Sequence, residues 1–304
     1  MSRIAEFIHR DLKHDADALN AFQGIIEEFG MSKRPVRFLS GVPLAPREYI
    51  IGSGIDKAGD TSQLVFGLTW GDTKYSGLER RRLTRRMGFP SWSWVGWKVE
   101  VVEAGKTKPG PVIELFGLTS TNSPFSSRRP GRFENHLNVG VELPDSTVIA
   151  WEGNEALIQS KFDKGEIPTY LHVKGWTFDL AIKRGTGDDW EVSWPEPAAR
   201  RKDYKPLERC CDVNLSHIGT SEVSAKVTLL ILCSTAHKYP YKVCLLIKYL
   251  EDIKAYERIG ICDLSHLLYY SGGRMVGLEA IVERSPTHAT LGHLQLVKSE
   301  IRLG

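Results

Sequence analysis

The chain has 304 residues, of which 41% are hydrophobic and 25% charged, the composition of a folded globular protein. Its 40 basic and 37 acidic side chains leave a net charge of +3, too balanced to indicate nucleic-acid binding. No apolar run approaches the ~18 residues of a membrane helix, and residues 1–15 lack the apolar core of a signal peptide. The five cysteines show no C-x-x-C spacing, so we expect reduced, buried thiols in a cytoplasmic protein.

The N-terminal part is predicted to be helical. Apolar residues recur at steps of three and four over residues 12–29, which places them on one helix face. Asp15 or Asp17 is the expected N-cap, and Gly30 the expected stop. A shorter amphipathic helix is expected over residues 4–12. Another helix or turn is expected to run through Thr61, Leu64, Val65, Leu68 and Trp70.

Around the tryptophans the pattern changes to that of a strand. In residues 88–102, GFPSWSWVGWKVEVV, Trp92 and Trp94 occupy even positions, whereas Trp97 and the valines after it occupy odd ones. A change of phase at a glycine, here Gly96, predicts a β-bulge.

Later segments predict more strands. Residues 169–182, TYLHVKGWTFDLAI, change phase at Gly175, which again predicts a bulged strand with one buried face. Near-continuous apolar runs at 227–233 and 243–247 predict central strands covered on both faces, joined by a hairpin. Further strands are expected at residues 256–263, 279–284 and 294–303.

These elements together predict an α+β fold. We expect a helical N-terminal layer, residues 1–87, packed on a β-rich body, residues 88–304, with a mainly antiparallel, bulged sheet or sandwich. The alternative is a single continuous domain.

Motifs for common cofactors are near misses. Gly54 and Gly59 have the spacing of a phosphate-binding loop, but Asp60 stands where the lysine belongs and would repel a triphosphate. A dinucleotide fingerprint fails at Lys57, where the third glycine is needed. No two histidines are four residues apart, and no Cys/His cluster has zinc-site spacing. We therefore expect no cofactor and no metal ion.

The run LERRRLTRRMG contains a dense basic cluster. It is a candidate contact patch for phosphate groups or a nuclear-localisation signal. The competing interpretation is a solvated loop or helix end that leads into the tryptophan strand. The cluster consists of Arg80, Arg81, Arg82, Arg85 and Arg86.

The tryptophans of residues 88–102 allow three interpretations. Stacking on nucleic-acid bases needs interleaved basic residues, and the alternating stretch holds only Lys98. A glycan platform needs coplanar, exposed rings. A packed core, with each indole N–H bonded to backbone or to a hydroxyl, is favoured. The residues expected to be structural are Trp92, Trp94, Gly96 and Trp97.

Several segments together resemble one protein family. They are DALNAFQGII from residue 17, GVP from 41, FGLTW from 66, and the arginines leading into FPSWSWVGW from 89. In this order they resemble the region that follows the HET domain in fungal heterokaryon-incompatibility proteins. Residues 243–247 and 256–261 resemble that family's C-terminal strands. The likeness is strong over residues 10–100 and loose over the rest.

The resemblance implies a relative of proteins that act in fungal nonself recognition. The HET domain itself should open with a Y-x-x-L-S-Y-x-W-G-like segment, which this sequence lacks, so its active residues cannot be transferred. We expect a non-enzymatic scaffolding or regulatory module with a protein partner and no membrane or nucleic-acid partner. It would be cytoplasmic, with the nucleus as the alternative suggested by the arginines. The competing hypotheses are a small-ligand or glycan-binding β-rich module, and a cryptic enzyme using residues such as His172, Asp179 or His237.

Overall fold

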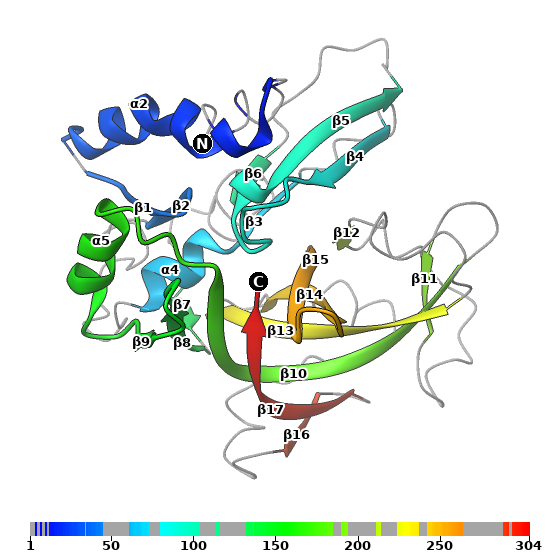
Figure 1. The fold of residues 1–304 in the computed structure, drawn as a ribbon. Helices are drawn as coiled ribbons and strands as arrows, with labels where there is room; N and C mark the ends of the chain where they lie inside the picture. The colour runs from blue at the N-terminus through cyan, green and yellow to red at the C-terminus, as the bar shows by residue number, and fades with distance from the viewer. Residues whose placement is uncertain are drawn as a thin grey trace.

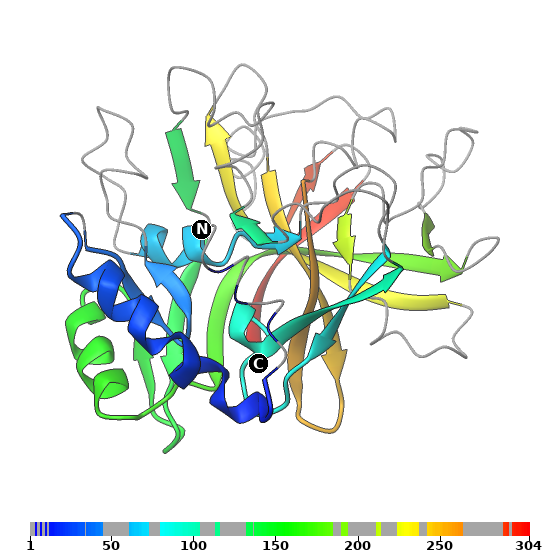
Figure 2. The same ribbon diagram turned by 90° about the horizontal axis from the view of Figure 1, so that it is seen from above.

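The protein has an α+β architecture in which helices cover one end of a large, mainly antiparallel sheet (Figure 1). Figure 2 shows that α2, α4 and α5 gather at this end. The structure is a computed structural model that describes residues 4, 7, 10, 12–33, 35–44, 61–72, 80–103, 113–115, 132–135, 137–184, 190–193, 211–213, 224–236, 242–263, 288–291 and 294–304.

The helices agree with the predicted apolar stripe, and Asp17 takes the predicted N-cap position of α2 without a side-chain bond. A 3-10 turn, η1 (Asp15–Asp17), leads into α2 (Ala18–Gly30), which buries Leu19 and Phe22. The N-termini of η1 and α2 receive no side-chain cap. Asp15 is directed toward an arginine instead, and Asp17 makes no capping bond. The helix or turn predicted from Thr61 onward is α4 (Thr61–Gly67). The helix α5 (Glu155–Asp163) was not predicted, because it buries only Ile158.

Among the described residues, the largest sheet has 11 strands. Its main path runs β16-β17-β15-β14-β13-β10-β8-β9, and β11, β12 and β7 pair with β10, β15 and β13. All of these pairs are antiparallel except β15 with β17. The bounds are β7 (Arg132–Asn135), β8 (Asn138–Glu142), β9 (Val148–Ala150), β10 (Tyr170–Arg184), β11 (Trp190–Ser193), β12 (Cys211–Val213), β13 (Ser224–Ala236), β14 (Lys242–Leu250), β15 (Ala255–Asp263), β16 (His288–Leu291) and β17 (Leu294–Leu303).

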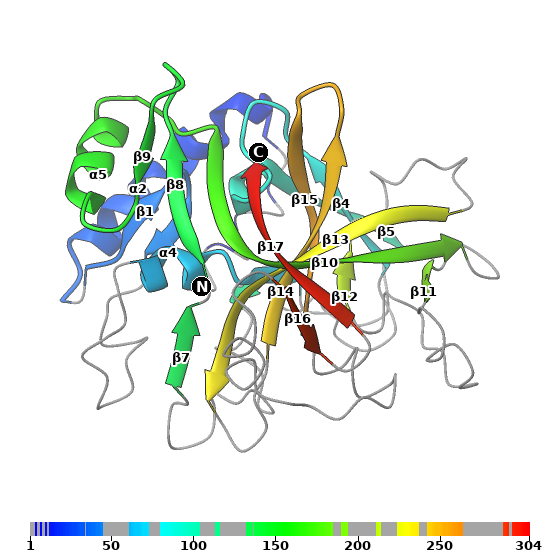
Figure 3. The same cartoon turned by 90° about the horizontal axis from the view of Figure 1, so that it is seen from below.

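The long strand β10 changes its buried side at Gly175, as the sequence predicts, but not through a bulge. Its ladder with β17 is continuous through Gly175. Leu171 and Val173 join the hydrophobic core under the helices, whereas Trp176 and Phe178 are buried on the opposite face. Burial thus passes from one face of the sheet to the other along this curved strand (Figure 3).

Bulges do occur elsewhere in the sheet. The register shifts between β13 and β14 at Ile231/Cys233, and between β14 and β15 at Leu246/Ile247. Residues 243–247 are all buried, which confirms the predicted central strand. The predicted strand at residues 279–284 lies outside the described residues.

Three two-stranded sheets complete the described fold. The β4–β5 ribbon crosses the predicted boundary between residues 87 and 88, and the hydrophobic core includes residues from both sides of it. No helix in the described part of the chain has the length and apolarity to cross a bilayer. The pairs are β1 (Arg37–Leu39) with β2 (Val42–Leu44), β3 (Trp70–Asp72) with β6 (Ile113–Leu115), and β4 (Arg80–Arg85) with β5 (Trp97–Glu103).

Two helical glycines provide a matched test of the packing. A Cβ added to Gly67 would lie 2.3 Å from the carbonyl oxygen of Pro43, whereas one added to Gly24 meets nothing within 4 Å. We expect Gly67→Ala to lower the free energy of unfolding by about 1–3 kcal/mol through overpacking. Gly24→Ala should raise it by about 0.5–1 kcal/mol, because alanine suits an exposed helix position better. Urea unfolding of both variants checks this; equal effects would contradict the packing of α4 on β2.

Candidate functional site

Residues 90–97, PSWSWVGW, form a buried turn that we call the tryptophan segment. The predicted strand through Trp92 and Trp94 is wrong, because the chain turns at residues 91–93 and then forms the 3-10 helix η2 (Trp94–Gly96). The strand, β5, begins only at Trp97. All three rings are at most 2% exposed, so the predicted core role is confirmed. Neither base stacking nor a glycan platform can use rings that solvent does not reach.

Trp94 joins the tryptophan segment to the N-terminal layer. Its ring packs edge-on against Phe22 of α2 and Phe7, with centroids 4.9 and 5.9 Å apart. Its indole N–H donates to the carbonyl of Gly41, between β1 and β2. Gly41 has a φ of +86°, and a Cβ there would collide with Val95, so this approach requires glycine.

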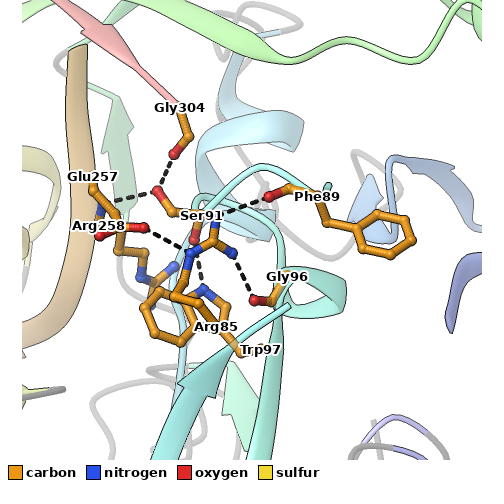
Figure 4. A network of polar contacts seen from close by, with 8 residues as sticks. All are labelled: Arg85, Phe89, Ser91, Gly96, Trp97, Glu257, Arg258 and Gly304. Carbon is orange, nitrogen blue, oxygen red and sulfur yellow. Dashed lines mark hydrogen bonds and ion pairs between the residues drawn. The ribbon is translucent and has the colours of Figure 1, made fainter. Parts of the chain in front are cut away.

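Ser91 joins the same segment to the far strands of the sheet (Figure 4). Its hydroxyl and its backbone N–H both donate to the carbonyl of Gly304, which follows β17. The hydroxyl also accepts from the backbone N–H of Arg258 in β15, at 2.8 Å. The indole N–H of Trp97 donates to the Ser91 carbonyl at 2.8 Å. The indole N–H of Trp92, in contrast, has no hydrogen-bond partner among the described residues.

Arg85 fixes both ends of the turn. Its Nε donates to Glu257 of β15 at 2.7 Å, while its two terminal nitrogens donate to the carbonyls of Gly96 and Phe89 at 2.6 and 2.8 Å (Figure 4). The guanidinium lies 4.9 Å from the ring centroid of Trp97. Burial lowers the pKa of Arg85 from its ordinary value, and the bond and charge of Glu257 oppose this shift. A Cβ at Gly96 would lie 2.5 Å from the backbone oxygen of Pro90 and 2.4 Å from Arg85 Nη1, so only glycine fits there.

Two further buried arginines surround the segment. Arg258 donates to the carbonyls of Leu68 and Trp70, and its guanidinium lies 3.6 Å from the Trp70 ring centroid. Arg86 is fully buried and donates through Nη1 to the carbonyl of Trp97 at 2.7 Å. Its Nε lies 3.4 Å from Asp15 of η1. Burial lowers the pKa of Arg86, and the charge of Asp15 opposes this.

The predicted arginine patch therefore divides into two parts. Arg85 and Arg86 are directed into the protein and cannot form an exposed contact patch. The physical reason is that each of them donates to backbone carbonyls inside the protein, namely those of Phe89, Gly96 and Trp97. The structure describes the backbone of Arg80, Arg81 and Arg82 in β4, and a contact role for those three stays a prediction.

A second polar cluster contains His172, one of the candidate enzyme residues. His172 Nε2 lies 2.6 Å from Glu142 on the neighbouring strand β8. Arg302 of β17 binds both oxygens of Glu142, at 2.7 and 2.9 Å, and stacks on the Tyr170 ring. The bond from Arg302, aided by His172 and opposed by burial, lowers the pKa of Glu142. The imidazole is oriented by a carboxylate, as in many acid–base pairs.

The other enzyme candidates do not join this cluster. Asp179 lies further along β10, where it pairs with Lys226 at 2.7 Å and accepts from Thr228. His237 and the glycine-rich residues 52–60 lie outside the described residues. Within the described ranges there is no group of three or more metal-ligating side chains.

Sequence reasoning missed the partners that complete both clusters. Glu257 and Arg258 are themselves buried, at 8% and 2% exposure, and they lie in a strand whose other residues are largely buried. Charged residues at buried strand positions must be paired, which was the available signal. Glu142 and Arg302 gave none, because their contact depends on β8, β10 and β17 lying side by side.

Comparison of the chain with family models, curated proteins and solved structures gave no match. The resemblance to heterokaryon-incompatibility proteins therefore stays an expectation from the residues themselves.

Replacing Trp94 tests the buried segment. Trp94→Ala should lower the free energy of unfolding by about 3–5 kcal/mol, because it removes a filled core volume and an indole bond. Met87→Ala, in the adjoining turn and 81% exposed, should change it by less than about 0.5 kcal/mol. Chemical denaturation measures both. Normal stability of Trp94→Ala would contradict the core assignment.

The lowered pKa of Glu142 predicts a pH dependence of stability. A carboxyl group with a folded-state pKa below its unfolded value stabilises the fold above the unfolded pKa. That stabilisation is lost as pH falls below about 4.5 and through the lowered folded-state pKa. Glu142→Gln should therefore show a weaker fall in urea midpoint over this range than the unmodified protein. Glu300→Gln, on an exposed pair with Lys174, is the control and should keep the full pH dependence.

Proposed function

We propose that this protein is a non-enzymatic module related to the region after the HET domain of fungal heterokaryon-incompatibility proteins. Its role is to scaffold or regulate a nonself-recognition response through contacts with another protein. The observation that carries the proposal is the burial of the tryptophan segment, which contains the most specific part of the resemblance. Its residues form an internal connection between the N-terminal layer and the sheet, with no exposed site among residues 90–97.

The polar groups of the tryptophan segment support a structural task. Catalytic groups need to reach a substrate, whereas Ser91 and Arg85 spend their bonds on Gly304, Glu257 and two backbone carbonyls. A segment used in this way fixes the relative positions of α2 and the sheet. Rigid positioning of surfaces is what a contact module requires.

The alternative functions have less support. Burial of Trp92, Trp94 and Trp97 removes the basis on which a ligand or glycan platform was considered. For an enzyme, His172 is the best described candidate, and its side chain is 28% exposed. However, Glu142 is only 6% exposed and already binds Arg302 and His172, so its carboxylate has little access to a substrate.

The test compares contact with catalysis in fungal cells. The tagged full chain is expressed in three separate forms: the unmodified protein, His172→Ala and, as a control on the exposed side of β10, Lys174→Ala. Chemical cross-linking with mass spectrometry identifies partners, and a cell-death reporter during fusion of unlike strains measures the response. We expect both variants to keep the partner and the response.

Two results would contradict the proposal. One is loss of the response in a folded His172→Ala variant that retains its partner, which favours an enzyme. The other is repeated cross-linking that captures no protein partner.

A further inference from the structure

We propose that the buried edge of Arg86, closed off by Asp15, is a binding site for a phosphate group. The proposal is independent of the proposed function, since it rests only on the contacts of Arg86 and on what covers it.

The guanidinium of Arg86 is only half used. Nη1 donates to the carbonyl of Trp97 at 2.7 Å and approaches that of Val95 at 3.4 Å. Nε and Nη2 have no hydrogen-bond partner in the part of the chain that the structure describes, although the side chain is fully buried. An unpaired N–H of a buried cation is costly, since it has lost water and gained nothing. The Nε–Nη2 edge is also the one that binds two oxygens of an anion side by side.

Asp15 lies over this edge without satisfying it. Its carboxylate oxygen forms an ion pair with Nε at 3.4 Å, but Nε makes no hydrogen bond of good geometry. The Asp15 side chain is 42% exposed, so it lies between the guanidinium edge and solvent. A rotation of Asp15 outward would open the edge to an anion.

The surroundings favour a phosphate over a carboxylate. A carboxylate in solution carries the same single charge as Asp15, which is tethered and therefore competes at high effective concentration. A phosphate group carries −1.5 to −2 charges and can present two oxygens to Nε and Nη2. Asp15 also sits in η1, directly before the 13-residue helix α2, whose N-terminal end attracts negative charge. Phosphate binding would thus displace the Asp15 carboxylate from the guanidinium edge of Arg86.

The experiment measures the thermal unfolding midpoint of the full chain against inorganic phosphate, with sodium chloride adjusted to hold ionic strength constant. The buffer is at about pH 7.5, where phosphate carries nearly two charges. Asp15→Asn removes the competing carboxylate, and Asp17→Asn removes the other aspartate of the same turn. Arg86→Lys keeps a charge but loses the two-pronged edge.

We expect phosphate to raise the midpoint of the unmodified protein. Asp15→Asn should reach half of the effect at a phosphate concentration at least about fivefold lower, because no fraction of the site is then occupied by Asp15. Asp17→Asn should stay within about twofold of the unmodified protein. Arg86→Lys should not respond. O-phosphoserine is used as a second probe. If it raises the midpoint at a lower concentration than inorganic phosphate does, the site prefers phosphate carried on a side chain; the reverse order indicates free phosphate.

Three results would overturn the site. They are equal phosphate dependence of Asp15→Asn and Asp17→Asn, an undiminished response in folded Arg86→Lys, and an equal response to sodium acetate. If Arg86→Lys fails to fold, the comparison of the two aspartate variants still decides the question.

Discussion

The fold depends on the buried ion pair between Arg85 and Glu257, which joins the end of β4 to strand β15. Both side chains are 10% exposed, so removing either would leave a charge with little access to water. The remaining N–H groups of Arg85 hold the carbonyls of Phe89 and Gly96. One side chain therefore shapes the turn that places all three tryptophans inside.

From this turn, contacts extend in two directions. Trp94 packs against Phe7 and Phe22, so the N-terminal layer lies on one side of the segment. Ser91 bonds Gly304 and Arg258, so β17 and β15 lie on the other. The helical layer and the β body consequently share a hydrophobic core. A sequence string that identifies a resemblance can thus owe its composition to packing, while any partner contacts a different surface.

The sequence predicted features that depend on local periodicity. The stripe on α2, the central run at residues 243–247 and the strand at 294–303 all follow from burial patterns that repeat with helix or strand period. The turn at residues 91–93 was missed because alternating tryptophans imitate a strand when three-dimensional partners are unknown. The bulge predicted at Gly175 was wrong for a related reason, since a switch of the covered face and a bulge give the same alternation. The ion pair of Arg85 with Glu257 spans 172 positions of the sequence, and that of Glu142 with Arg302 spans 160 positions. No local pattern encodes contacts over such separations.

The central claim is that residues 90–97 couple the N-terminal layer to the far strands of the sheet. Amide hydrogen exchange, followed by mass spectrometry in the unmodified protein and in Ser91→Ala, tests it most directly. The substitution removes the hydroxyl that bonds Gly304 and Arg258 but leaves Trp94 in place. The account predicts that protection falls together in residues 255–263, 294–304 and 18–30. Loss confined to the two strands, with α2 exchanging as before, would contradict it.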